Sequence, residues 1–429
     1  MKTIEKFLTP GLLTFFRGII CSFSGAVLLG VINYLIRRIL VQNLSQTDFG
    51  FFYSMFALFN MLATFFQFGI QQVAPILTAR YIAQRQEKRI NCLISFLFFA
   101  AGLTGLVLMC ILFVFSNRLA AAFFKYPEAV AAIRMFTPFV LLLPLWIVLQ
   151  SIPHGKKDFP VYNAMGIVQM GLILAGVCFA ARQGAFSVCL AWVAGFAAAF
   201  AASAFFIFRK YQIHLIFRAV FCRGIFRQLW NLCTWITGSV TGIMLLANLD
   251  TFCLTWLSDL QEVAAYNIAL PIMQIMQTVQ VLPLVFLPVA VDLWQKKKYA
   301  EIRRIFYLVN ALLALGSIPL VLVTRWLGSW LITLLFGAQF TSAAPALTIL
   351  SGGILFYCAG QFNLNLLNSA NDQKNGMFLI VAAIAADLLL NILLIPRYGF
   401  IGAAIAMAAT YILTAGTTFA RAFYRLRKV

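Results

Sequence analysis

Ionisable side chains inside otherwise apolar segments are the residues of this chain most able to carry chemistry. Arg17 lies near the start of the first apolar run, Asp250 in the seventh and Asp387 midway along the eleventh. A charged group in a membrane-spanning segment is costly, so each is a candidate functional residue. Asp387 precedes Asn391 by four residues on one helical face, and this pair can simply satisfy a neighbouring helix. We therefore expect Asp250 to be the acid that exchanges a proton or a cation.

Uncharged polar residues recur at helical spacing in two apolar segments that lie 214 positions apart. The first stripe, at i, i+4, i+7 and i+11, is Asn60, Thr64, Gln67 and Gln71. The second stripe is Gln274, Gln277 and Thr278. Such faces can hydrogen-bond between packed helices, or they can line a wet cavity that holds a hydroxyl-rich ligand. Two corresponding stripes favour the cavity.

The composition indicates an integral membrane protein. Hydrophobic residues make up 63% of the chain and charged residues 10%, against about 25% charged in an ordinary soluble domain. The first apolar run has no cleavage site for a signal peptidase and begins a series of spans. The net charge of +20 is spread over the connections between spans, so we expect no nucleic-acid partner. The nine cysteines stand singly in apolar runs, which favours neither disulfides nor a metal site.

The hydropathy pattern predicts twelve membrane spans, each close to the roughly 20 residues that a bilayer requires. They lie near 15–36, 49–70, 92–115, 131–153, 161–181, 186–208, 232–256, 264–290, 305–325, 345–367, 376–396 and 400–420. Most of the 32 lysines and arginines fall in alternate connections, which include both chain ends. The excess of positive charge in cytoplasmic connections therefore predicts that both termini are cytoplasmic.

An internal repeat organises these spans. Asp158 and Asp372 lie 214 positions apart, and so do Asp48 and Glu262, each pair in equivalent connections. We therefore expect an all-α fold of two six-helix lobes, 1–208 and 232–429, as in secondary transporters. The connection 209–231 is basic and amphipathic, which is typical of a helix that lies on the membrane surface.

Catalytic motifs are absent from the sequence. Its two histidines, His154 and His214, lie in predicted connections without acidic partners at metal-ligand spacing. There is no glycine-rich phosphate loop, nucleophile elbow or zinc-protease motif. We therefore expect neither an enzyme nor a metal site.

Several segments resemble the polysaccharide-transport flippases of the multidrug/oligosaccharidyl-lipid/polysaccharide exporter superfamily. They are Arg38–Leu40, Leu44–Ser45, Asp48–Phe52, Phe68–Ile70, Leu335–Gly337, Gly360–Gln361 and Leu394–Gly399. The chain departs from the family at Ala264 and Ala265, where the second-half motif usually has glycine beside tyrosine.

The resemblance implies alternating-access transport of undecaprenyl-pyrophosphate-linked sugar units across the bacterial inner membrane, for O-antigen, capsule or exopolysaccharide assembly. The partners it implies are the lipid-linked oligosaccharide, membrane lipids, a polysaccharide polymerase and chain-length proteins. It implies no cofactor beyond a coupling H⁺ or Na⁺. Two alternatives stay open: a cation-coupled multidrug exporter of the same superfamily, and a membrane-embedded polysaccharide polymerase or glycosyltransferase.

A pyrophosphate cargo gives the arginines of the first span a specific role. Arg38 is the match to a basic residue that the family often has at the end of this span, and Arg17 lies roughly 30 Å away along the helix at 1.5 Å per residue. Guanidinium groups bind phosphate with two parallel hydrogen bonds. We expect both arginines to bind the headgroup, although both can instead reach lipid phosphates as anchors.

Overall fold

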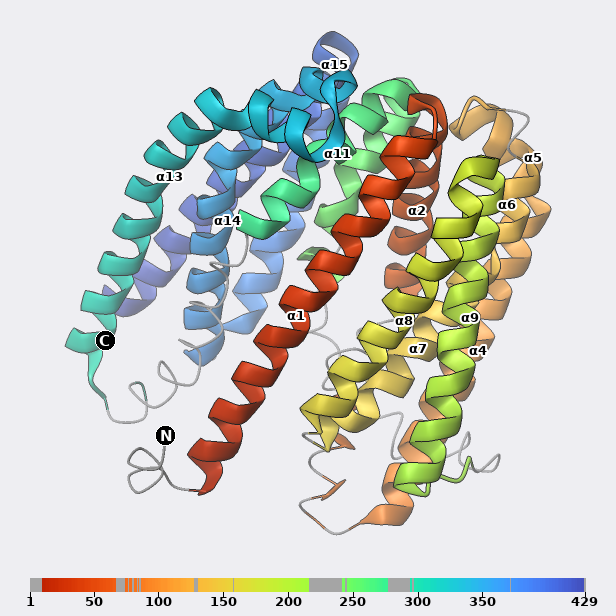
Figure 1. The fold of residues 1–429 in the computed structure, drawn as a ribbon. Helices are drawn as coiled ribbons and strands as arrows, with labels where there is room; N and C mark the ends of the chain where they lie inside the picture. The colour runs from red at the N-terminus through yellow and green to blue at the C-terminus, as the bar shows by residue number, and fades with distance from the viewer. Residues whose placement is uncertain are drawn as a thin grey trace. The chain divides into compact units, whose positions relative to one another are not determined.

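The computed structural model describes residues 10–66, 74–126, 130–215, 241–276 and 294–427, apart from 76, 79–80, 83, 85, 157, 244, 295–296 and 371. For residues 10–23, 65–66, 87 and 274 only the backbone is described. Regular structure in the described residues is helical throughout, without strands (Figure 1). The predicted all-α class is confirmed.

The chain forms two compact units. The first is Met1–Leu44, Leu62–Ala120 and Pro127–Cys233, and the second is Ser45–Met61, Ala121–Tyr126 and Thr234–Val429. The first unit contains α1 (Pro10–Asn43), α4 (Glu87–Val114), α5 (Ser116–Arg118), α6 (Val130–Phe136), α7 (Pro138–Gly155), α8 (Phe159–Ala180), η3 (Ala181–Gln183) and α9 (Ala185–Tyr211). The second contains a Thr241–Leu257 helix, α11 (Leu260–Met276), α13 (Tyr299–Phe336), η6 (Ala338–Ala343), α14 (Ala344–Ser369) and α15 (Gln373–Arg427). The segments α2 (Gln46–Phe66) and η1 (Leu119–Phe123) cross the boundaries between the two.

Prolines and one acid mark where several helices begin. Pro138, Pro160 and Pro345 lie in the first turns of α7, α8 and α14, where the N–H that proline lacks has no helical partner. Asp158 Oδ1 accepts a hydrogen bond from the Val161 N–H at 3.4 Å and caps α8. The starts of α8 and α14 lie within two residues of the predicted spans 161–181 and 345–367, whereas the predicted span 131–153 is divided between α6 and α7.

A single glycine divides the 55-residue α15. Gly399 has φ +54° and ψ −136°, a conformation that side chains disfavour. The next N–H, that of Phe400, donates to Glu262 Oε2 at 2.6 Å, so the carboxylate satisfies a backbone group released by the kink. The kink separates the predicted spans 376–396 and 400–420.

Eight described helices are long and apolar enough to cross a membrane. They are Ser24–Asn43, Lys88–Val114, Val130–Gly155, Phe159–Gln183, Ala185–Tyr211, Tyr299–Phe336, Ala338–Ser369 and Gln373–Arg427. With α2, the Thr241–Leu257 helix, α11 and the second half of α15, every predicted span coincides at least in part with a described helix. The chain is therefore a multi-pass membrane protein.

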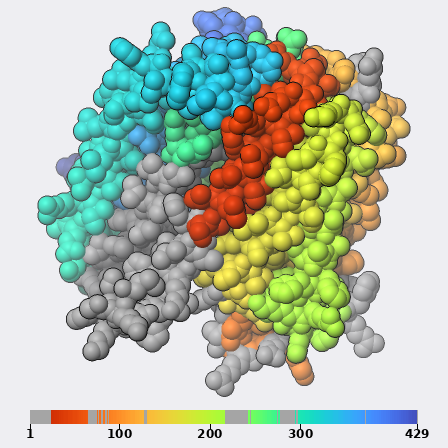
Figure 2. Space-filling model, viewed as in Figure 1, coloured from red at the N-terminus to blue at the C-terminus, as the bar shows by residue number. Residues whose placement is uncertain are grey.

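Large apolar side chains cover the outward faces of the first unit's helices. Figure 2 shows α1, α8 and α9 side by side, and exposed residues on them include Val27, Leu172, Phe179 and Phe205. Apolar surface on this scale requires lipid rather than water around it. The predicted lobe limits stay a prediction, because most of the connection 209–231 lies outside the described residues.

Candidate functional site

Five polar side chains meet inside the second unit, and we call them the buried polar cluster. Asp250 comes from the Thr241–Leu257 helix, Tyr266 from α11, and Asp387, Asn391 and Thr410 from the two halves of α15. Each is at most 2% exposed to solvent. Burying so many polar groups is costly unless they satisfy one another, so their hydrogen bonds decide whether the site is stable.

Each carboxylate oxygen of the cluster accepts a hydrogen bond from a neutral donor. Asn391 Nδ2 donates to Asp250 Oδ1 at 2.8 Å and to Asp387 Oδ2 at 3.1 Å. The Tyr266 hydroxyl donates to Asp250 Oδ2 at 2.9 Å, and the Thr410 hydroxyl donates to Asp387 Oδ1 at 2.9 Å. One amide nitrogen thus joins two acids from different helices.

The charge of the cluster is not balanced by any basic side chain that the structure describes. Among the described residues, no lysine, arginine or histidine forms an ion pair with Asp250 or Asp387. Two carboxylates around one amide repel each other strongly in a medium of low dielectric constant. The pair is therefore stable when one acid holds a proton or when a cation lies between them.

The amide of Asn391 uses one of its two polar atoms in the cluster. Its Oδ1 is buried and, within the described part of the chain, receives no hydrogen bond. No group of three or more His, Cys, Asp or Glu side chains that could hold a metal occurs among the described residues.

The other half of the repeat fills the equivalent positions with apolar side chains. At 214 positions before Asp250, Asp387 and Asn391 stand Ile36, Ile173 and Val177. These three residues are at most 1% exposed, like the polar ones. The fold therefore accepts hydrophobic packing at this place, and helix packing alone does not require the acids of the second half.

The structure shows which side chains surround Asp250, the acid that the sequence singled out. The sequence placed Asp250 as an isolated acid and treated Asp387 with Asn391 as a pair that satisfies a neighbouring helix. The structure shows that this neighbour is the helix that carries Asp250. Sequence reasoning missed Tyr266 and Thr410, because hydroxyls are common in apolar helices. The 214-position offset was a usable signal, since it pairs each buried polar residue with an apolar one.

The other candidate residues lie apart from this cluster or outside the described part. Asn60 is half-buried on α2, and its Nδ2 donates to the Phe56 carbonyl oxygen of the same helix at 3.0 Å. Thr64 is buried on α2 at 9% exposure, and Arg38 is exposed near the end of α1. Arg17 and Gln274 have described backbone only, in α1 and α11, and Gln67, Gln71, Gln277 and Thr278 lie outside the described residues.

Comparisons with known proteins agree with the predicted resemblance. A family described as polysaccharide biosynthesis protein matches residues 15–294. A curated relative, an uncharacterized membrane protein of Methanocaldococcus jannaschii, is 24% identical over 417 residues, which cover 92% of this chain and 82% of the relative.

Solved structures show the fold. An inward-facing multidrug resistance MATE transporter of the MOP superfamily matches with a TM-score of 0.75 and 13% identity over 93% of this chain and 95% of its own. The lipid II flippase MurJ, in an inward closed conformation, matches with a TM-score of 0.72 and 14% identity over 96% and 89%. A MOP superfamily transporter from Pyrococcus furiosus matches with a TM-score of 0.65 and 13% identity over 96% and 95%.

These findings confirm the resemblance that the sequence motifs carried. The chain shares the fold of these solved transporters, and its family match extends over more than half of its length. The protein belongs to the polysaccharide biosynthesis protein family of membrane proteins.

Proposed function

We propose that this protein is a flippase that moves undecaprenyl-pyrophosphate-linked oligosaccharide units across the bacterial inner membrane. The family match over residues 15–294 carries the proposal. The twelve-span repeat supports it, because two similar lobes can alternate access to one site between leaflets. The cargo crosses without a change in its covalent bonds. It feeds the assembly of O-antigen, capsule or exopolysaccharide, alongside a polymerase and chain-length proteins.

Deletion of the gene tests this function. We expect lipid-linked repeat units to accumulate in the cytoplasmic leaflet and surface polysaccharide to be lost, and a plasmid copy to restore both. Normal surface polysaccharide together with new sensitivity to drugs would instead favour the multidrug exporter.

We further propose that the buried polar cluster couples transport to a proton or a sodium ion. The observation behind this proposal is that Asn391 Nδ2 bonds to both Asp250 and Asp387 without a basic partner among the described residues. Loading or removing a positive charge changes how strongly the two helices attract each other. An ion that binds one state of the transporter better than the other shifts the balance between states by the difference in affinity.

Substitution of the two acids tests the coupling. Asp250→Asn and Asp387→Asn keep the side-chain shape but remove one charge each, so we expect transport to lose its dependence on a pH or sodium gradient. Glu301→Gln is the matched control, because Glu301 is exposed and pairs with Lys298 on the surface. Gradient-dependent transport at the normal rate in both cluster variants would remove the cluster from the mechanism.

Applying a pH gradient and a sodium gradient separately identifies the coupling ion. If a proton is the coupling ion, a pH gradient alone drives wild-type transport, and sodium has no effect. If sodium is the coupling ion, a sodium gradient drives transport at constant pH. A dependence on neither ion would contradict the coupling proposal while leaving the flippase proposal intact.

The proposed orientation places both termini in the cytoplasm. It rests on the distribution of lysine and arginine among the connections. A fluorescent protein fused to the C-terminus should fluoresce, whereas alkaline phosphatase fused there should be inactive. Active phosphatase at the C-terminus would reverse the orientation.

A further inference from the structure

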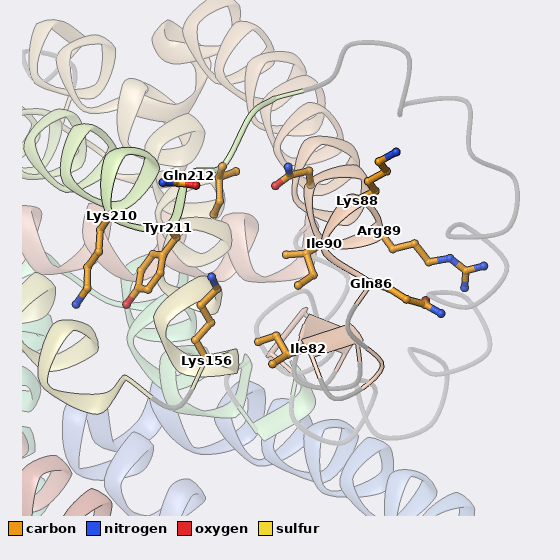
Figure 3. Close-up of a pocket in the computed structure, with 11 residues that line it drawn as sticks. Ile82, Gln86, Lys88, Arg89, Ile90, Lys156, Lys210, Tyr211 and Gln212 are labelled. Atoms are coloured by element: carbon orange, nitrogen blue, oxygen red, sulfur yellow. The ribbon is translucent and has the colours of Figure 1, made fainter.

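A basic pocket lies at one end of the first unit, between the start of α4 and the ends of α7 and α9 (Figure 3). Its volume is about 1150 Å³, which exceeds the roughly 300–1,000 Å³ of ordinary ligand pockets. Lys88, Arg89, Lys156 and Lys210 line it, and its described lining residues include no acid. None of the candidate residues predicted from the sequence is among them.

The cations lie in two groups on opposite sides of the pocket. Figure 3 shows Lys88 and Arg89 on α4 on one side, with their side chains directed outward, and Lys156 and Lys210 beside Tyr211 on the other side. Lys156 Nζ lies 4.6 Å from the centroid of the Tyr211 ring, and Lys210 Nζ lies 5.4 Å from it. Tyr211 therefore orients both ammonium groups by cation–π attraction.

Most of this positive charge has no counter-charge among the residues that the structure describes. Lys210 Nζ pairs with Asp158 Oδ2 at 2.8 Å, so one of the four charges is balanced. Among the described residues, no carboxylate pairs with Lys88, Arg89 or Lys156, and all three are exposed. The pocket thus offers about three positive charges to an anion.

The position of the pocket in the fold indicates that its ligand is a lipid. The pocket lies where the spans Lys88–Val114 and Ala185–Tyr211 end, which is the depth of the lipid headgroups. Ile90 and Ile213 line it as buried apolar residues, and Phe205 and Phe206 on α9 are 67% and 50% exposed nearby in sequence. A lipid could place its phosphate against the basic lining of the pocket and its acyl chains against the exposed phenylalanines of α9. Basic pockets between spans are suited to anionic headgroups.

We propose that this pocket binds the phosphate groups of an anionic lipid headgroup. Two sources share that chemistry, namely an ordinary anionic phospholipid of the membrane and the pyrophosphate lipid of the proposed cargo. The second source rests on the proposed function, whereas the first does not. Four cations from α4, the end of α7 and α9 around one pocket suit an anionic headgroup, and the cytoplasmic location predicted for all four residues puts the site on the loading side of the membrane.

Native mass spectrometry of the full-length protein in detergent tests the proposal. The probes are dioleoylphosphatidylglycerol, undecaprenyl pyrophosphate, dioleoylphosphatidylcholine as the uncharged control, and inorganic pyrophosphate. We expect the wild type to retain at least one of the two anionic lipids in preference to phosphatidylcholine. The variant K88Q/R89Q/K156Q should weaken that binding about a hundredfold, since it removes three cations that line the pocket and each charge in contact with the headgroup contributes about fivefold.

Three further variants distinguish loss of the pocket from a general loss of charge or of folding. R209Q/R304Q/R427Q removes three exposed charges outside the lining of the pocket, and binding should stay within about twofold of the wild type. K88R/K156R keeps the charge and should keep the binding. If the triple pocket variant does not fold, the single variant R89E should still weaken lipid binding more than tenfold.

The outcomes separate the sources. Retention of phosphatidylglycerol identifies a phospholipid site, and retention of undecaprenyl pyrophosphate alone identifies a cargo-loading site. Equal retention of phosphatidylcholine, binding of inorganic pyrophosphate without either lipid, or unchanged binding by K88Q/R89Q/K156Q would overturn the proposal. A protein that binds phosphatidylglycerol here but moves no lipid-linked oligosaccharide would contradict the proposed function and leave this site standing.

Discussion

Asp158 and Asp372, 214 positions apart, each hold the basic end of the last helix in their own unit. Asp158 Oδ2 accepts hydrogen bonds from Lys210 Nζ at 2.8 Å and from the Tyr211 hydroxyl at 2.7 Å. Asp372 Oδ2 accepts from Arg421 Nε at 2.7 Å, and its Oδ1 accepts from Arg421 Nη2 at 3.1 Å. In both halves of the repeat, an aspartate in the connection between the fourth and fifth spans therefore binds a basic residue at the end of the sixth.

The ionisation of Asp372 makes its ion pair with Arg421 dependent on pH. Partial burial opposes ionisation, but hydrogen bonds from Arg421 and Asn375 and the positive charge of Arg421 outweigh it, and the pKa of Asp372 is lowered from 3.8. A lowered pKa in the folded state stabilises the protein above pH 3.8, and this stability is lost as pH falls through the lower folded pKa.

We therefore expect Asp372→Asn to destabilise the protein at pH 7 by about 1 kcal/mol, because solvent screens part of the pair. The difference between variant and wild type in thermal unfolding should shrink as pH falls below 3.8. Asp158→Asn is the companion variant, since the pKa of Asp158 is also lowered against partial burial, by hydrogen bonds from Lys210 and Tyr211. A difference that stays constant down to pH 3 would show that Asp372 does not act through its charge.

Exchange of the cluster for its counterpart in the other half separates folding from function. In D250I/D387I/N391V, three of the five residues of the cluster become the residues found at positions 36, 173 and 177. Replacing buried charges with packed hydrophobic residues is often neutral or stabilising, so we expect normal expression and an unfolding temperature no lower than that of the wild type. Transport should be lost.

The single variant Asn391→Val should behave in the opposite way. It leaves Asp250 and Asp387 without their shared donor, which costs about 1–3 kcal/mol for an unsatisfied buried group. Thermal unfolding in detergent measures both variants. An unstable triple variant beside a stable single variant would mean that the cluster is a structural requirement of the fold.

The kink in α15 gives a test of the backbone. Gly399 has φ +54°, and a Cβ at this position would collide with the Glu262 carboxylate, whose Oε2 accepts the Phe400 N–H. Gly399→Ala should destabilise the protein by about 1–3 kcal/mol. Gly416→Ala is the control, because a Cβ built there meets no other described part of the protein within 4 Å and α15 is helical at that residue. Equal unfolding temperatures for the two variants would show that the kink tolerates side chains.

Arginine chemistry in the first span can be tested by a conservative substitution. A lipid anchor tolerates lysine, whereas a bidentate phosphate site does not. We expect Arg17→Lys to reduce transport sharply, and Arg17→Ala nearly to abolish it, at unchanged protein level. Arg38→Lys provides the comparison at the other end of the helix. Full transport by Arg17→Lys would leave Arg17 as an anchor.

The sequence predicted the fold better than the site, for a physical reason. Span positions follow from hydropathy and from the alternation of lysine and arginine, which are local signals, and the Leu394–Gly399 motif marked the break in α15. Asp250 was identifiable because an acid in an apolar span stands out. Its partnership with Asn391 depends on a contact across 141 positions, which spacing along one helix cannot reveal.

Reconstitution of the purified protein into liposomes tests the central claim most directly. Vesicles carrying undecaprenyl-pyrophosphate-linked oligosaccharide in both leaflets are treated with a membrane-impermeant glycosidase, which removes sugar only from the outer leaflet. We expect the wild type to expose the protected half of the cargo over time under an ion gradient, and empty liposomes and D250N vesicles to leave it protected. Cargo that stays protected with active wild-type protein, while a cationic drug crosses the same vesicles, would contradict the account.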